Sequence, residues 1–164
     1  MKKVLLLFLA LIALMMHVHS IFANERVEHL KTEAKAREFE KEKQIIQHLF
    51  AERAVLWNKL YQEPKNLIKY SQKLEEIVAE PLLTFDKKAF QDAVAFPTDL
   101  EKIMGVEVFN IENVAYGRTG MEAEIDVLWK MEGLYGNYEE QIRYRVILKK
   151  ENESWKLSDY TVSQ

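Results

Sequence analysis

The chain has 164 residues, no cysteine, and a formal net charge of −3 from 23 basic and 26 acidic side chains. This length suits one folded domain, since domains commonly have roughly 100–200 residues. The missing cysteines exclude a disulfide scaffold, a thiolate metal site and a cysteine nucleophile, and the acidic balance argues against a general nucleic-acid binder, which needs a basic surface.

Residues 1–23 are predicted to be an export segment. Two lysines precede an apolar run from Val4 to Met16, and these are the charged and hydrophobic parts of a secretory signal. The run is short for a membrane span, which needs about 20 residues. The two possible cleavage sites, after Ser20 and after Ala23, each lack the small residue expected two positions earlier. A cleaved signal peptide and an uncleaved N-terminal membrane anchor therefore stay open, and in both cases the rest of the chain is secreted or at the cell envelope.

Residues 24–43 are predicted to form a charged helical spacer. Six acidic and six basic side chains fill these twenty positions, so the segment cannot bury a core face. Opposite charges recur three or four positions apart, as in Glu33 and Arg37, and each such pair supports a helix by roughly 0.2–0.5 kcal/mol. A binding arm or a coiled-coil strand is the alternative, although the apolar a and d positions of a coiled coil are missing.

Three amphipathic helices are predicted before any strand. The first begins near Gln44 and ends at Pro64, and the second runs from there to Pro81, because proline cannot continue a helix. The third is expected to begin with Thr84 or Asp86 as its cap. Apolar side chains recur at three- and four-residue steps in all three. The inward residues expected are Ile45, Ile46, Leu49, Phe50, Leu56, Trp57, Leu60 and Tyr61 in the first helix, Leu67, Tyr70, Leu74, Ile77 and Val78 in the second, and Phe85, Phe90 and Val94 in the third.

The hydrophobic period changes from 3.6 to 2 near Gly105, which predicts strands. Four runs alternate between apolar and polar residues, with a bulge expected at Phe109–Asn110, and their glycine-rich connections are too short for crossovers. The sequence therefore predicts an α+β domain over residues 44–164, with N-terminal helices packed on a curved, antiparallel, four-stranded meander. The apolar residues of the four runs are Val106, Val108, Ile111, Val114, Met121, Ala123, Ile125, Val127, Trp129, Met131, Tyr138, Ile142, Tyr144, Val146, Leu148, Trp155, Leu157, Tyr160 and Val162.

The last predicted strand reads Trp155-Lys156-Leu157-Ser158-Asp159-Tyr160. Helices followed by a bent sheet that closes on such a strand resemble the nuclear transport factor 2-like (cystatin-like, cone-shaped) superfamily, in its exported bacterial type. The resemblance implies a curved sheet that can enclose a pocket. It also implies a homodimer that forms through the sheets. The layout of export segment, spacer and domain also resembles the extracytoplasmic scaffold subunits of bacterial secretion and conjugation machines. The chain departs from the superfamily's enzymes, because none of its four histidines falls on a predicted strand.

Six residues are candidates for lining a small-molecule pocket between the helices and the sheet. Five are bulky aromatic residues, which either line such a pocket or fill a solid core. The sixth is Asp159, which points inward by strict alternation; burial there would raise its pKa, as a general base requires. The alternative is a bulge that turns Asp159 outward so that Tyr160 packs inside. The candidates are Trp57, Tyr70, Trp129, Tyr144, Trp155 and Asp159.

Charged residues on the outer face of the predicted sheet have two interpretations. One is a patch for an anionic partner, and the other is ion pairing with acidic residues on the next strand. The basic row is Arg143, Arg145, Lys149 and Lys156, and the acidic residues are Glu122, Glu124 and Asp126.

We expect an exported, non-enzymatic domain that mediates protein–protein interaction or scaffolding at the cell envelope. The partner would be another protein or a second copy bound through the sheet face. A small-ligand binding domain with an aromatic pocket is the alternative, and a lyase or isomerase that uses Asp159 comes third. We expect no cofactor, and no metal site, since no histidines or cysteines have ligand spacing. Membrane contact is expected only through residues 1–23, if they are not cleaved.

Overall fold

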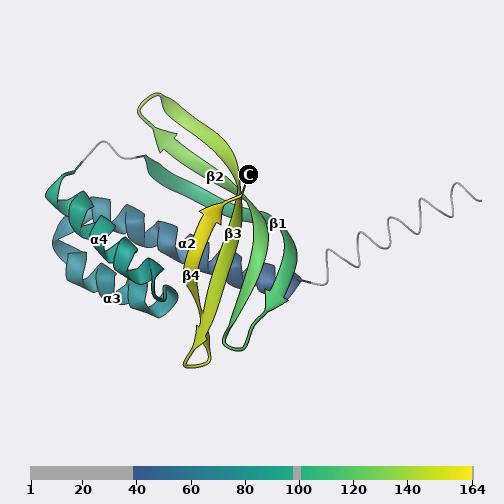
Figure 1. Ribbon diagram of the computed structural model, residues 1–164. Coiled ribbons are helices and arrows are strands. Elements are labelled where there is room, and N and C mark those ends of the chain that lie inside the picture. The colour runs from purple at the N-terminus through teal and green to yellow at the C-terminus, as the bar shows by residue number, and fades with distance from the viewer. Residues whose placement is uncertain (1–38, 98–100, 164) are drawn as a thin grey trace, which may run out of the picture. The chain divides into compact units, whose positions relative to one another are not determined.

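The computed structural model describes residues 39–97 and 101–163 (Figure 1). The predicted export segment and most of the predicted spacer lie outside these residues. Among the described residues, no helix is both long and apolar enough to cross a membrane. The elements in chain order are α2 (Glu40–Gln62), the 3₁₀ turn η1 (Pro64–Asn66), α3 (Leu67–Ile77), α4 (Leu82–Ala95), β1 (Lys102–Tyr116), β2 (Gly120–Gly133), β3 (Gly136–Glu151) and β4 (Ser154–Val162).

The four strands form one antiparallel sheet in the order β1-β2-β3-β4. This meander, preceded by helices, confirms the predicted α+β fold. The bulge predicted in β1 is also confirmed: the pairing with β2 shifts between Val108 and Asn110, so Phe109 is the additional residue. Along β2, buried and half-buried residues alternate from Met121 to Val127, as the period-2 pattern predicted.

Helix α4 differs from the prediction at its N-terminus. It begins at Leu82, directly after Pro81, and neither predicted residue caps it. The inward position expected for Phe85 is also wrong, because this side chain is 66% exposed. The buried residues of α4 are instead Leu82, Asp86 and Phe90, spaced four apart. The buried face includes Asp86 because an arginine of α2 neutralises its carboxylate, as described below.

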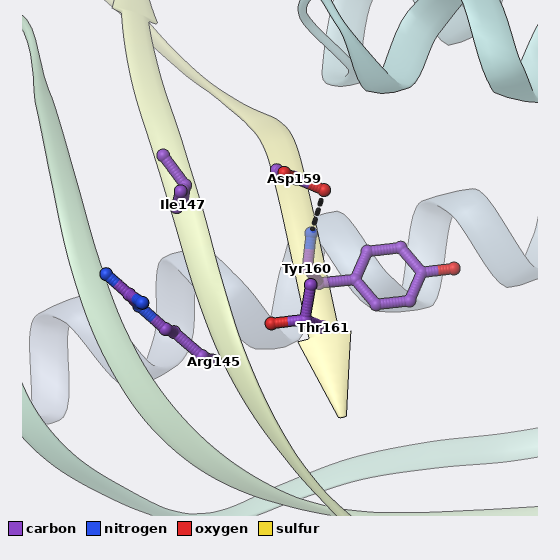
Figure 2. Close-up of a pocket in the computed structure, with 5 residues that line it drawn as sticks. All are labelled: Arg145, Ile147, Asp159, Tyr160 and Thr161. Atoms are coloured by element: carbon purple, nitrogen blue, oxygen red, sulfur yellow. Dashed lines mark hydrogen bonds between the residues drawn. The ribbon is translucent and has the colours of Figure 1, made fainter. Parts of the chain in front are cut away.

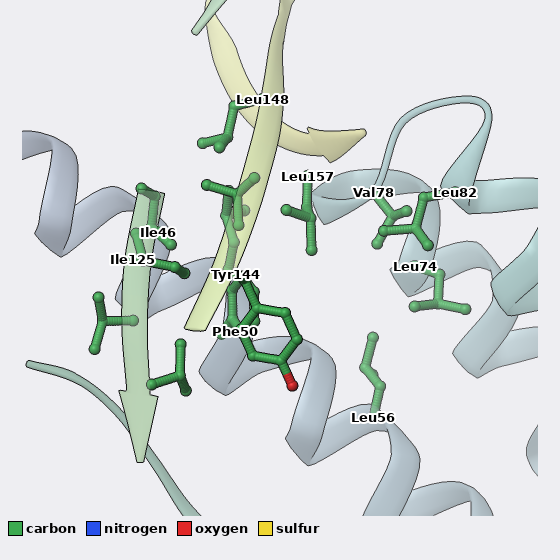
Figure 3. Packing of buried hydrophobic residues seen from close by; sticks show 14 of the residues in the cluster. Ile46, Phe50, Leu56, Leu74, Val78, Leu82, Ile125, Tyr144, Leu148 and Leu157 are labelled. Atoms are coloured by element: carbon green, nitrogen blue, oxygen red, sulfur yellow. The ribbon is translucent and has the colours of Figure 1, made fainter. Parts of the chain in front are cut away.

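The helices cover the inner face of the sheet, and their apolar side chains meet in one core (Figure 3). The core combines residues from α2, α3, α4 and all four strands. Its largest fully buried side chains are Phe50, Phe90, Ile46, Leu60, Leu74, Ile125, Leu148 and Leu157. Since each buried aliphatic or aromatic side chain contributes about 1.5–3 kcal/mol, this cluster is the main source of stability.

Side-chain amides of α2 cover part of the free edge of β1. The Gln47 amide donates to the Val106 carbonyl oxygen at 2.8 Å and accepts from the Val108 N–H at 2.6 Å. The Asn58 amide likewise donates to the Ile103 carbonyl oxygen at 2.6 Å and accepts from the Ile103 N–H at 3.1 Å. These bonds occupy backbone groups that another strand would otherwise pair with, so they protect an edge where sheets commonly aggregate.

The segment between α3 and α4 covers part of the opposite edge, along β4. Val78 forms a parallel bridge with Leu157, and the Ala79 N–H donates to the Leu157 carbonyl oxygen at 2.9 Å. The buried Ser158 hydroxyl donates to the Glu80 carbonyl oxygen at 2.7 Å. Both edge strands are therefore held by the helical layer over part of their length.

The turn between β3 and β4 contains a residue in an unfavourable conformation. Asn152 and Glu153 have φ angles of 49° and 66°, in the left-handed region that asparagine adopts more readily than glutamate. We expect Glu153→Gly to raise the free energy of unfolding by about 0.5–1 kcal/mol, because Asn-Gly is the preferred pair for such a turn. Urea denaturation would measure the change. Asn152→Gly is the matched control and should give a smaller gain, and equal gains would contradict the conformational explanation.

Candidate functional site

A bulge in β4 determines where Asp159 lies. Leu157 pairs with Leu148, but Asp159 pairs with Ile147, so Ser158 is the additional residue. The bulge reverses the alternation beyond it. Tyr160 packs inward, edge-on against Tyr144 at 5.5 Å between ring centroids. The inward position of Asp159 expected from strict alternation is therefore wrong, and the alternative with an outward Asp159 is confirmed.

Asp159 lines a small hollow on the outer side of β3 and β4 (Figure 2). The hollow has a volume of about 170 Å³, and its other lining residues are Arg145, Ile147, Tyr160 and Thr161. The Asp159 carboxylate accepts a hydrogen bond from the Tyr160 N–H at 2.8 Å, so it caps the backbone at the bulge. A base inside an enclosed cavity was the premise of the lyase or isomerase hypothesis, and this position removes that premise.

Two of the aromatic candidates lie together on the inner face of the sheet. Trp129 Nε1–H donates to the Tyr144 hydroxyl oxygen at 3.2 Å. The Phe50 ring lies 6.0 Å from the Trp129 ring and 6.1 Å from the Tyr144 ring. Burial raises the pKa of the Tyr144 hydroxyl above its ordinary value.

The other three aromatic candidates lie elsewhere in the fold. The Trp57 ring packs edge-on against Phe90 at 4.6 Å. The buried Tyr70 donates its hydroxyl to Glu63 at 2.8 Å. Trp155 pairs with Lys150 beside the β3–β4 turn. The predicted set therefore does not converge on one pocket.

A second hollow, of about 390 Å³, lies at the β1–β2 turn and is lined in part by Tyr116, Met121 and Leu148. Neither this hollow nor the one beside Asp159 is lined by any of the five aromatic candidates. The two hollows therefore lend no support to the aromatic pocket of the small-ligand alternative.

A buried ion pair that the sequence reasoning missed joins α2 to α4. The Arg53 Nε and Nη2 atoms donate to the two Asp86 carboxylate oxygens at 2.7 and 2.6 Å. The two side chains are only 14% and 4% exposed, and the guanidinium carbon lies 5.3 Å from the Tyr160 ring centroid. Burial opposes the charge on Arg53, but the bonds and charge of Asp86, together with Tyr160, raise the pKa of Arg53 above its ordinary value.

The sequence held a signal for each member of this pair. Arg53 lies three residues after Phe50 and four before Trp57, within the apolar stripe of its helix. Asp86 lies four residues before the buried Phe90. A charge in an apolar stripe indicates a buried partner. Because both Asp86 oxygens already accept hydrogen bonds, the pair is suited to hold two helices together rather than to transfer protons.

Ion pairs occupy the outer face of the sheet. Arg143 lies 3.0 Å from Glu112, 3.8 Å from Glu124 and 3.7 Å from Asp126. The two lysines of the predicted basic row, at positions 149 and 156, each donate to a backbone carbonyl oxygen of the α3–α4 region at 2.6 Å. The contacts of Arg143 and the Arg145–Glu122 pair at 2.6 Å confirm the ion-pairing interpretation for the two arginines. Lys156 pairs instead with Glu151, at 3.1 Å.

The turn between β2 and β3 carries exposed apolar residues. We call residues 129–142, which comprise this turn and the adjoining parts of both strands, the hairpin arm. Leu134 and Tyr135 form its two-residue tip and are 81% and 99% exposed, more than any other large hydrophobic residue that the structure describes. The Tyr138 hydroxyl donates to Glu101, which raises the pKa of Tyr138 to about 12. The arm is therefore the part of the described chain with the most exposed apolar side chains.

No protein-family model matches the chain, and no curated protein is significantly similar to it. Similar solved structures include the intermembrane space region of the chloroplast protein ARC6, at 13% identity over 68% of this chain and 91% of that chain, with a TM-score of 0.43. An NTF2-like protein of unknown function from Prochlorococcus marinus is 15% identical over 48% and 62%, with a TM-score of 0.37. A SEC-C motif containing protein from Rhodopseudomonas palustris is 11% identical over 65% and 72%, also with a TM-score of 0.37. At this level of overlap the likenesses assign no family and no activity.

Proposed function

We propose that this chain is an exported, non-enzymatic domain that binds another protein at the cell envelope, with the hairpin arm as its docking surface. The exposure of Leu134 and Tyr135 at the tip carries the proposal. Tight turns favour glycine, asparagine and aspartate, so nothing in the turn itself calls for two bulky apolar side chains. Adjacent exposed apolar residues of this kind are typical of binding surfaces, where tyrosine is often a main contributor to affinity.

The base of the arm is fixed before any partner binds. Tyr138 is held by Glu101, and a Cβ at Gly133 would lie 3.3 Å from the Tyr138 ring, so the glycine leaves room for that ring. Gly136 has a φ of +119°, a conformation that glycine adopts without strain and that closes the turn. A surface that is already ordered loses less conformational entropy on binding.

The sheet face is less suited to docking than the arm. Its cations already pair with carboxylates on neighbouring strands, as Arg143 and Arg145 do. A partner that covered these ion pairs would have to remove their water without offering better partners, which costs binding energy. The tip of the arm has no such cost, because its side chains are apolar.

Export is supported by the charged and apolar parts of residues 1–23. Cell fractionation, followed by N-terminal sequencing of the chain, tests this half of the proposal. Recovery of the chain in the cytoplasm with its first residues intact would contradict it.

Site-specific cross-linking in the source cells tests the docking half. A photo-reactive amino acid in place of Tyr135 should give a discrete protein adduct. The same amino acid in place of Asn152, in the β3–β4 turn, should give none. Purified wild-type chain in excess should suppress the adduct, and the Leu134→Ser/Tyr135→Ser variant should not. Identical adducts from both positions, or equal competition by the variant, would overturn the proposal.

A further inference from the structure

We infer that the hairpin arm binds a second copy of this chain, through a row of lysines on η1 and the first two turns of α3. The inference rests on the proposed function, because it names the partner of the same surface. Two exposed regions of opposite charge, each with an exposed apolar residue, carry the argument.

The first region is the lysine row, made of Lys65, Lys69 and Lys73. The three residues are spaced four apart and exposed, so they follow one face of the helix. None of them has an ion pair with any residue that the structure describes. Ile68 lies next to Lys69 and is 76% exposed. The row therefore offers positive charge beside an apolar side chain.

The second region is the hairpin arm, whose remaining charge is negative. Lys102 pairs with Glu132 at 3.4 Å, and Lys130 pairs with Glu107 at 3.9 Å, so the nearby lysines are already used. The next acidic residues of the arm are Glu139 and Glu140, which are exposed and have no ion pair in the described part of the chain. Glu139 and Glu140 lie opposite Lys130 and Trp129, three and four pairs from the Gly133–Gly136 pair that closes the tip. Because consecutive strand residues point to opposite faces, the arm offers one such carboxylate on each face below its apolar tip.

The fold keeps these two regions apart within one chain. The segment that follows α3 forms a bridge with Leu157 of β4, and Leu157 pairs with Leu148 of β3. Leu148 lies twelve positions further along β3 than Gly136, where the arm tip ends. Figure 1 shows the β2–β3 turn at the top of the view and α3 at the lower left, below α4. One chain cannot bring the arm onto its own lysine row, whereas two chains can do so, either reciprocally in a closed dimer or head to tail.

Such a contact depends on salt. Exposed charges interact over a Debye length of about 8–10 Å at physiological ionic strength, and complementary patches mainly increase the rate and specificity of association. The tip residues Leu134 and Tyr135 would contribute most of the apolar contact. We therefore expect weak association that is strongest at low ionic strength.

Sedimentation velocity of the full purified chain tests the inference by charge exchange. The wild type should associate at about 50 mM NaCl and dissociate as the salt rises to about 500 mM. Glu139→Lys/Glu140→Lys and Lys69→Glu/Lys73→Glu should each weaken self-association at least tenfold. An equimolar mixture of the two variants should restore association, because the positive arm of one variant then faces the negative α3 surface of the other.

A control variant and the cross-linking result separate the possible failures. Lys59→Glu/Lys88→Glu carries the same change in charge on exposed lysines of α2 and α4, and it should leave association within twofold of the wild type. Circular dichroism confirms that each variant is folded. A chain that stays monomeric at low salt, or a mixture that stays dissociated, overturns the inference. If Tyr135 still cross-links to a different protein, the proposed function stands without it.

Discussion

Replacing Asp86 with alanine is expected to lower the free energy of unfolding by about 3–5 kcal/mol, because the charge of the other partner would then be buried without a counter-charge. Arg53 is almost buried, and in this variant it would lose both of its hydrogen bonds to the carboxylate. The pair also connects α2 to α4, so both helices would lose a fixed contact. Urea denaturation monitored by circular dichroism measures the loss.

A double variant separates the charge effect from a packing effect. In Arg53→Met/Asp86→Leu, apolar side chains of similar size replace the whole pair, and buried pairs replaced in this way commonly cost little or even gain stability. We expect its free energy of unfolding to lie within about 1 kcal/mol of the wild type. If the double variant were as unstable as Asp86→Ala, the loss of stability would come from packing, and the explanation by a buried, unpaired Arg53 charge would be wrong.

The regular parts of the fold were predictable because their hydrophobic periods are long and clear. The alternation from Met121 to Val127 identified both the strand β2 and its inward face. The three helices followed from apolar residues at helical spacing and from Pro64 and Pro81, which end the first two predicted segments. Local sequence determines such features, so a single sequence contains enough information for them.

The features that the sequence left open or did not indicate depend on contacts between residues far apart in the chain. The bulge at Ser158 leaves no periodic signal, because a single additional residue reverses the inward set beyond it. Ser158 is nevertheless anchored by its bond to Glu80, 78 residues away. The Arg53–Asp86 pair spans 33 positions, so the sequence could indicate two misplaced charges but not their pairing. The arrangement of the aromatic candidates was unpredictable for the same reason: size predicts burial, but not which rings meet.

The arm, in contrast, was visible in the sequence and was interpreted only as a turn. Gly133 and Gly136 correctly predicted the hairpin, and the two residues between them are the most exposed apolar pair described. Two bulky apolar residues between the glycines of a hairpin turn were the sequence signal that could have indicated an exposed apolar surface. Because the helical layer covers parts of both sheet edges and ion pairs occupy the outer face, the arm is the described surface that offers a partner the most apolar contact.

Gly120→Ala is the second substitution for which we expect a large effect. Gly120 begins β2, opposite Lys149 in β3. A Cβ at this position would lie 2.5 Å from the Leu148 carbonyl oxygen and 3.6 Å from its carbonyl carbon. These are backbone atoms of a paired strand, so no side-chain rotation relieves the clash. We expect a loss of about 3 kcal/mol, the upper part of the range for overpacking, measured by urea denaturation.

The neighbouring glycine provides the matched control. A Cβ at Gly117 would have its nearest neighbour, the Gly120 carbonyl oxygen, at 3.8 Å, which is ordinary van der Waals contact. Gly117→Ala changes the same turn by the same methyl group, and it should cost less than about 1 kcal/mol. The difference between the two variants then measures the close approach of β2 to β3 itself. Equal losses would show instead that the turn requires glycine at both ends for its backbone conformation, and that the clash with Leu148 is not the cause.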